Sequence, residues 1–96
     1  MRAVIPKQTY LDITHFFGFN QQLLKGAEEC GELVRSLCRY NYDKTEDNLE
    51  NMIEEIADVE IMITQIKEFM QINDEVEIEK IAKIRRTLDY IGAKDE

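Results

Sequence analysis

Residues 20–40 read NQQLLKGAEECGELVRSLCRY, and this stretch decides the fold. Apolar side chains recur in it at steps of four, three, four and three, at positions Leu23, Ala27, Cys30, Val34 and Leu37. Those steps return to one side of a helix that has about 3.6 residues per turn. The stretch is therefore predicted to form one long amphipathic helix, whose apolar side is an arc centred near Leu23, Ala27 and Val34.

Helical signals continue on both sides of this stretch. A short helix is expected over residues 7–17, and two further long helices over about 45–70 and 75–91. Gly18 and Gly92 are expected to end the first and the last of these helices. One proline and four glycines in 96 residues leave few breaks, which favours long helices over many short strands. The predicted fold is all-α, with three long antiparallel helices, a short N-terminal helix and a four-helix-bundle-like core completed by oligomerisation.

The length of the chain predicts one helical domain over residues 1–96. Within it, residues 1–6 are expected to be an extended lead-in and residues 93–96 a polar tail. So short a chain buries a smaller fraction of its surface than a large one. Oligomerisation is an economical way to cover the apolar sides of long helices, so a homodimer or homotetramer is expected.

Charge excludes several classes of partner. Twelve Lys and Arg residues stand against 20 Asp and Glu residues, giving a net charge of −8. Nucleic-acid polymers and anionic membranes are bound mainly through basic side chains, so neither is expected as a partner. No segment reaches the roughly 20 apolar residues of a membrane-spanning helix.

Two cysteines without a signal peptide are typical of a cytoplasmic protein, and Cys30 and Cys38 are predicted to be reduced core residues.

Two clusters of acids are the informative part of that charge. Each holds a pair of carboxylates three residues apart, Glu29 with Glu32 and Glu55 with Asp58. Residues with this spacing are neighbours on a helix surface. Glu29 and Glu55 lie at the edges of the apolar arcs, so both pairs are expected to face the seam between two helices. Four carboxylates there would repel one another, and hard oxygen donors suit Mg²⁺, Mn²⁺ or Ca²⁺ better than Zn²⁺.

These residues resemble the motif of the MazG-like, all-α nucleoside triphosphate pyrophosphohydrolases. That family carries E-E-x-x-E and, after a gap, E-x-x-D; this chain has Glu28-Glu29-x-x-Glu32 and Glu55-x-x-Asp58, with residues 33–54 between them. The resemblance covers about residues 18–90. It implies a dimeric or tetrameric enzyme that hydrolyses a nucleoside or deoxynucleoside triphosphate to the monophosphate and pyrophosphate.

Residue roles follow from the same resemblance. Glu29, Glu32, Glu55 and Asp58 would hold Mg²⁺, with Mn²⁺ as a possible substitute, and the metal would activate a water molecule. Glu28 matches the first acid of the motif, where it would orient or deprotonate that water. The triphosphate also needs cations, and the last helix offers Lys80, Lys83 and Arg86 on one side. Lys25, one turn before Glu29, is a further phosphate candidate. The alternative for the basic residues is that they balance the acids of neighbouring helices.

Base recognition is not assigned by the sequence. Aromatic side chains near the first long helix could stack on a base or simply pack, and Gln21 and Gln22 could bind a base edge. These aromatic residues are Phe16, Phe17, Phe19, Tyr40 and Tyr42. The main competing hypothesis is a non-catalytic helical oligomer, a regulatory or adaptor module, whose acids are surface charge or a metal site retained without turnover.

Overall fold

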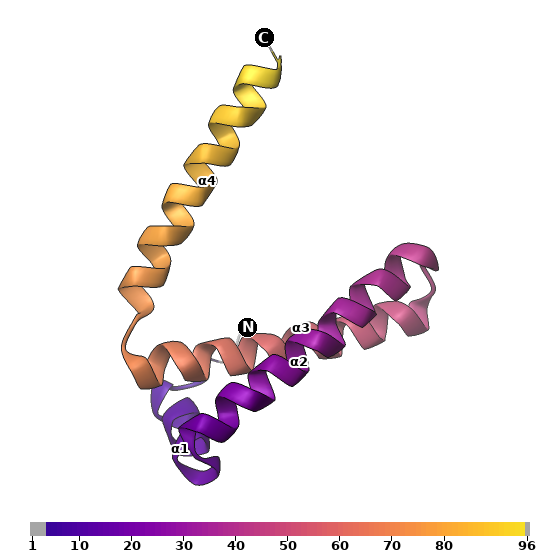
Figure 1. Ribbon diagram of the computed structural model, residues 1–96. Helices are drawn as coiled ribbons and strands as arrows, with labels where there is room; N and C mark the ends of the chain where they lie inside the picture. The colour runs from indigo at the N-terminus through magenta and orange to yellow at the C-terminus, as the bar shows by residue number, and fades with distance from the viewer. Residues whose placement is uncertain (1–3, 96) are drawn as a thin grey trace.

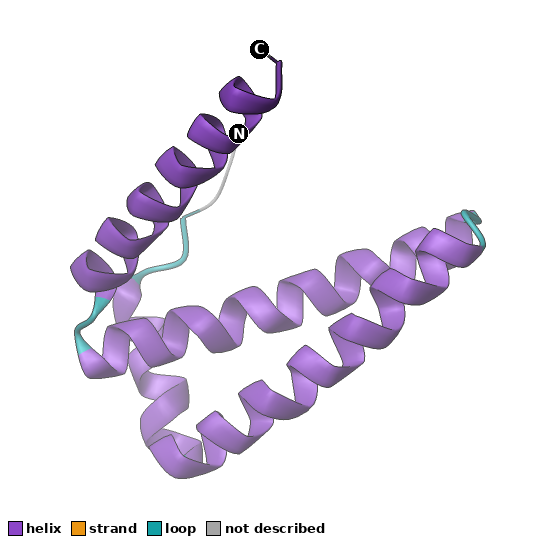
Figure 2. Cartoon of the chain, turned by 45° about the horizontal axis from the view of Figure 1, so that its top comes forward, coloured by secondary structure: helices purple, strands orange, loops and turns teal. Residues whose placement is uncertain are grey.

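The computed structural model describes residues 4–95, and every regular element in that range is a helix (Figures 1 and 2). The elements are α1 (Lys7–Phe17), α2 (Phe19–Tyr42), α3 (Glu46–Met70) and α4 (Asn73–Asp95). The predicted all-α fold, with one short and three long helices, is confirmed.

The breaks between the first three helices have local causes. Gly18 separates α1 from α2 with a φ of 93°, a backbone conformation that glycine adopts without strain. Thr45 caps α3, because its side-chain oxygen accepts a hydrogen bond from the backbone N–H of Asn48 at 3.2 Å. Gly18 was expected to end the first helix, and the third helix was expected to begin at about residue 45.

The last helix is longer than predicted. It begins at Asn73 and continues through Gly92 to Asp95, so the expected polar tail is wrong for residues 93–95, while Glu96 lies outside the described residues. Gly92 keeps a negative φ and does not adopt the left-handed conformation that terminates helices. A glycine inside a helix costs about 1 kcal/mol relative to alanine but does not by itself end it.

Helices α2 and α3 form an antiparallel hairpin, joined by the short connection Asp43–Thr45. Helix α1 packs against both of them near the opposite end of the hairpin. Helix α4 points away from this unit and does not pack along any other described helix (Figure 1). The radius of gyration is 16.6 Å, whereas a compact chain of this length would have about 12.5 Å. The difference reflects the projecting α4.

The seam between α2 and α3 follows a heptad-like spacing on each helix. On α2 it consists of Gln22, Gly26, Glu29, Leu33 and Ser36, and on α3 of Met52, Glu55, Val59, Met62 and Ile66. Among the large hydrophobic residues of the described chain, only Val59 and Met62 are buried, each with 7% of its surface exposed. Polar contacts cross the seam as well, since the Ser36 hydroxyl donates to Asn51 Oδ1 at 2.9 Å.

A second polar contact joins α1 to α3. Thr14 is fully buried, and Gln65 is 2% exposed. The Thr14 hydroxyl lies 2.8 Å from the carbonyl oxygen of Tyr10 and 3.0 Å from Gln65 Oε1, so its proton is shared between two acceptors. This buried pair fixes α1 beside the hairpin.

The apolar arc predicted on α2 does not face α3. Leu23, Val34 and Leu37 are 40%, 62% and 46% exposed. Cys30 and Cys38 are exposed too, so their predicted place in the core is wrong. The reason is rotation of the helix: the seam lies one residue earlier in the sequence than the arc, about 100° around α2.

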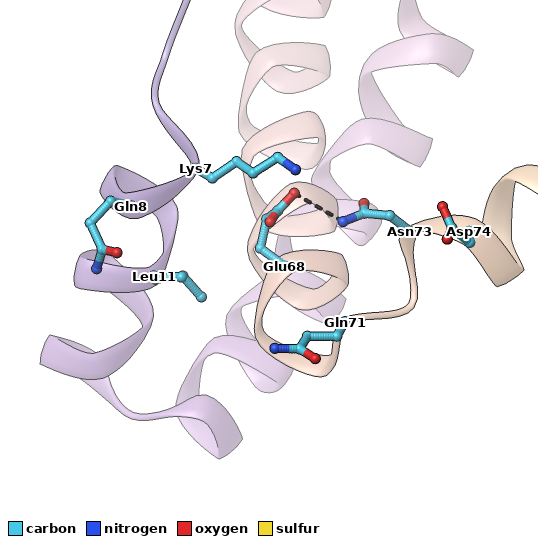
Figure 3. Close-up of a pocket in the computed structure, with 7 residues that line it drawn as sticks. All are labelled: Lys7, Gln8, Leu11, Glu68, Gln71, Asn73 and Asp74. Carbon is cyan, nitrogen blue, oxygen red and sulfur yellow. Dashed lines mark hydrogen bonds between the residues drawn. The ribbon is translucent and has the colours of Figure 1, made fainter.

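The junction between α3 and α4 is fixed by hydrogen bonds. Gln71 adopts the left-handed conformation, with a φ of 56°, and the N–H of Ile72 donates to the carbonyl oxygen of Lys67 at 3.1 Å. The Asn73 side chain then donates to Glu68 Oε1 at 3.0 Å across the turn (Figure 3). These contacts set the direction in which α4 leaves the hairpin.

Over the described residues, none of the helices combines the length and apolar character needed to span a membrane.

Candidate metal centre

Three of the predicted metal ligands come together in the hairpin. Glu29 on α2 and Glu55 and Asp58 on α3 each place a carboxylate oxygen within 4.8 Å of the other two. Glu29 and Glu55 belong to the seam and approach from opposite helices. Asp58 lies one turn after Glu55 and one residue before the seam position Val59, so it faces the same side as the other two carboxylates.

We call Glu29, Glu55 and Asp58 the acidic cluster. Glu55 is the member of this cluster that has a buried oxygen atom, Oε2, without a hydrogen-bond partner. Burial raises the pKa of Glu55 above its usual value, and the nearby charges of Glu29, Asp58 and Glu32 raise it further. A buried carboxylate oxygen without a donor is costly, because it has lost its water and gained nothing in return.

The donor set fits a hard divalent cation. It contains carboxylate oxygens only, which is the chemistry that Mg²⁺ and Mn²⁺ prefer. The unpartnered Glu55 Oε2 is an atom that such a cation would satisfy. Three protein carboxylates leave positions free for water and phosphate, as Mg²⁺ usually requires.

Lys25 already supplies one positive charge at the acidic cluster. Its ammonium nitrogen lies 3.2 Å from Glu29 and 3.5 Å from Glu28. These ion pairs raise the pKa of Lys25, with the hydrogen bond to Glu29 as the largest cause. The side chain of Glu29 is 12% exposed and that of Lys25 is 49% exposed, so the lysine reaches the cluster from its solvent side.

The remaining acids of the predicted site lie at its margin. Glu32 is not within the 4.8 Å group; its side chain is 42% exposed and pairs with Arg35 at 3.5 Å. Glu32 still acts on the site through its charge, which contributes to the raised pKa of Glu55. Glu28, the predicted catalytic acid, is largely exposed and pairs with Lys25.

The basic residues of α4 are not brought to this cluster within one chain. Lys80, Lys83 and Arg86 are all exposed on a helix that does not pack against α2. Lys80 pairs with Glu77 on its own helix at 3.4 Å. Among the four predicted phosphate ligands, Lys25 alone lies beside the acidic cluster in the described chain.

An open pocket of about 500 Å³ adjoins Lys25 and Glu28. It lies between α1 and the hairpin, and its lining is mixed apolar and amide: Ile13, Phe17, Gln21, Gln22, Leu24, Met62 and Gln65 complete it. Phe17, Gln21 and Gln22 were candidates for base contacts and do line this pocket. Phe19, by contrast, stacks on Phe69 with ring centroids 4.3 Å apart.

Gln65 is the pocket residue that sequence reasoning missed. It stands amid apolar residues of α3, and a polar residue flanked by a helical apolar pattern is the only signal that could have pointed to it.

Comparison of the chain with protein-family models, with curated proteins and with solved structures found no match.

Proposed function

We propose that this protein is a Mg²⁺-dependent nucleotide pyrophosphohydrolase that cleaves a nucleoside or deoxynucleoside triphosphate to the monophosphate and pyrophosphate. The observation that carries this proposal is the convergence of Glu29, Glu55 and Asp58 around an unpartnered, buried Glu55 oxygen. These residues occupy positions of the E-E-x-x-E and E-x-x-D motif through which the chain resembles the MazG-like family. Three of the four acids assigned to the metal are adjacent in space.

The chemistry proposed for the site divides among named side chains. Glu29, Glu55 and Asp58 would hold Mg²⁺, with Mn²⁺ as a substitute and Glu32 adding negative charge nearby. When bound, the metal neutralises phosphate charge and lowers the pKa of a coordinated water molecule. Lys25 would exchange its contact with Glu29 for one with a phosphate oxygen. Glu28, which borders the open pocket, would accept the proton of the attacking water.

The pocket beside Lys25 gives the nucleoside a place to bind. Its volume of about 500 Å³ lies within the usual range of small-molecule sites, and it opens next to the acidic cluster. Phe17 offers an aromatic face, and Gln21 and Gln22 offer amide groups for a base edge. We place the enzyme in the cytoplasm as a homodimer or homotetramer, in keeping with its reduced thiols and its exposed apolar surface.

A panel of nucleoside and deoxynucleoside triphosphates, incubated with the protein and Mg²⁺, tests the activity through pyrophosphate release. Glu55→Gln is expected to abolish the release and also the Mg²⁺-dependent rise in melting temperature. Glu54→Gln is the matched control, because Glu54 is an exposed neighbour outside the 4.8 Å group. If no nucleotide is turned over and Mg²⁺ does not raise the melting temperature, both the enzyme and the metal site are refuted.

One observation favours the alternative, a helical oligomer that does not catalyse. The ion pair between Lys25 and Glu29 compensates part of the cluster's charge without any metal. This alternative predicts a Mg²⁺-dependent rise in melting temperature without turnover of any nucleotide, or neither effect. The same two measurements therefore separate an enzyme, a structural metal site and an acidic surface.

A further inference from the structure

Many of the exposed apolar side chains of the hairpin lie on one side of it. On α2 they follow the seam residues by one position: Leu23 after Gln22, Ala27 after Gly26, Val34 after Leu33 and Leu37 after Ser36. On α3 the same rule holds: Ile53 after Met52, Ile56 after Glu55 and Ile63 after Met62. In two antiparallel right-handed helices that face each other, the positions one residue after the seam lie on the same side of the pair. We call this side the apolar face.

Helix α4 carries a matching apolar stripe without a partner. Ile81, Ile84 and Leu88 are 44%, 59% and 61% exposed, and Ile78 and Ile91 extend the stripe at both ends. From Ile78 to Ile91 the stripe is about 20 Å long, and Leu23 to Leu37 span about 21 Å of α2. The two apolar surfaces are therefore of equal length, and both lie open in one chain. Monomeric proteins rarely expose apolar patches of this extent.

A chain cannot join these two surfaces to each other, because the junction between α3 and α4 holds them apart. The left-handed Gln71, the Ile72 N–H bonded to Lys67 and the Asn73 side chain bonded to Glu68 fix α4 in its projecting direction (Figure 3). Figure 1 shows α4 leaving the end of α3 at a wide angle to the hairpin. A second copy of the chain supplies both missing partners at once.

Charge supports the same pairing. Glu60 follows the seam residue Val59 by one position and so places an acid on the apolar face. Helix α4 carries two bases that flank its stripe, Lys80 and Arg85, whereas Lys83 and Arg86 lie on the opposite side of the helix. An α4 lying on the apolar face would bring positive charge next to an otherwise unpaired carboxylate, which is favourable for association.

We propose that α4 is an arm exchanged between two copies of this chain, so that in a two-fold dimer α4 of each copy lies along the apolar face of the other. Such an exchange closes on itself, because each copy gives one arm and receives one. The proposal concerns the side of the hairpin away from the acidic cluster and does not rest on the proposed hydrolase activity.

Two single variants and their mixture test the exchange by sedimentation velocity at micromolar concentration. The unmodified chain is expected to sediment with twice the mass of one chain. Ile84→Glu damages the arm and Val34→Glu damages the apolar face, and each is expected to weaken the dimer at least about 100-fold, because a charge enters both contacts of the dimer. Ala82→Glu on α4 and Arg39→Glu on α2 place the same carboxylate off these surfaces and should leave the dimer intact.

An equimolar mixture of the Ile84→Glu and Val34→Glu proteins gives the sharper result. A mixed dimer contains one undamaged contact, the arm of the second variant on the apolar face of the first. The other contact of the mixed dimer holds both carboxylates, but a contact that one carboxylate has already abolished loses nothing more from the second, so the mixture should associate about tenfold more tightly than either variant alone. Circular dichroism confirms that each variant stays helical, and Ile84→Ser and Val34→Ser replace any variant that does not.

Three results would overturn the exchange. The first is a chain that sediments as a monomer. The second is a dimer that survives one of the two variants, since contact between two apolar faces would not need Ile84 and contact between two arms would not need Val34. The third is a mixture that associates no better than its components. Pyrophosphate release is a separate readout, so loss of the dimer and loss of the proposed activity are distinguishable.

Discussion

The two sides of the α2–α3 hairpin differ in chemistry although the same helices make both. Positions one residue before the seam carry charge and amides, among them Lys25, Glu28 and Asp58. Positions one residue after the seam carry six exposed large apolar side chains of the pair, Leu23, Val34, Leu37, Ile53, Ile56 and Ile63. Two residues, about 200° of helix rotation, thus separate these two sides, and the seam residues Glu29 and Glu55 of the acidic cluster lie between them.

This contrast shows that apolar burial in the seam is not the main source of the hairpin's stability. Its seam contains Gln22, Glu29, Ser36 and Glu55, and few apolar side chains are buried there. Most apolar surface of the two long helices lies outside the seam. The fold therefore keeps a polar interior with an unpartnered carboxylate oxygen at the site and leaves its hydrophobic surface for another chain.

The largest expected effect lies on the acidic side. Glu29→Gln removes one ligand and the ion pair with Lys25, so pyrophosphate release should fall at least about 100-fold, more than is typical for loss of a residue that only supports a ligand. Glu50→Gln, at an exposed position of α3 outside the cluster, is the control and should keep full activity. Equal activity in the two variants would contradict the role proposed for Glu29 in holding the metal.

The contact that holds α1 on the hairpin gives the next effect. Thr14→Val leaves Gln65 Oε1 buried without its donor, so the free energy of unfolding should fall by about 1–3 kcal/mol in urea titration. Thr9→Val changes the same residue type at an exposed position of α1 and should cost much less. A loss of the same size in both variants would mean that the buried pair contributes nothing special.

The pH dependence of stability is expected to include a contribution from Glu55 on the acidic side. Because the folded state raises the pKa of Glu55 above 4.5, the contribution of this group to stability is present below that pH and is lost as pH rises through the folded pKa. Thermal melts at a series of pH values from below 4.5 upward, without divalent metal, should show this loss of stability in the unmodified chain. Glu55→Gln should flatten it, whereas Glu54→Gln removes only the weakest of the charges that raise the pKa of Glu55 and should keep most of it; an unchanged slope in Glu55→Gln would contradict the prediction.

The smallest effects come from two glycines of α2. An added methyl group at Gly26 would lie 3.6 Å from Met62 Cβ and 3.7 Å from Ile66 Cδ1, which is ordinary contact, and at Gly31 it would meet nothing within 4 Å. Both alanine variants should stabilise the helix by up to about 1 kcal/mol in urea titration. A loss of stability confined to Gly26→Ala would show that the seam is tighter than these distances indicate.

Much of the secondary structure could be predicted, because its signals are local. The residues that stop or cap helices, Gly18 and Thr45, act through their own backbone or side chain. Gly92 misled the prediction because a glycine ends a helix only where the chain takes up the left-handed conformation, and here it does not. Residue identity alone does not distinguish the two cases.

Three of the four acids predicted to hold a metal lie together, whereas Glu32 and the surroundings of the cluster were not predicted. Glu29, Glu55 and Asp58 meet as expected, because pairs three residues apart on adjacent helices share a side. Which side of α2 faces α3 could not be read from hydrophobicity, since the stronger apolar arc is the exposed one. The distance of Lys80, Lys83 and Arg86 from the cluster depends on the direction of α4, which hydrogen bonds at Gln71 and Asn73 set after α3 ends.

The short connection Asp43–Thr45 also governs the order of events when the chain folds. Helices joined by three residues make contacts that are local in sequence, and chains with such contacts fold in microseconds to milliseconds. Meeting another molecule at micromolar concentration takes longer, because it depends on diffusion and orientation. The hairpin therefore forms before its apolar surface can be covered, and newly made chains pass through an interval in which that surface is open to whatever they meet first.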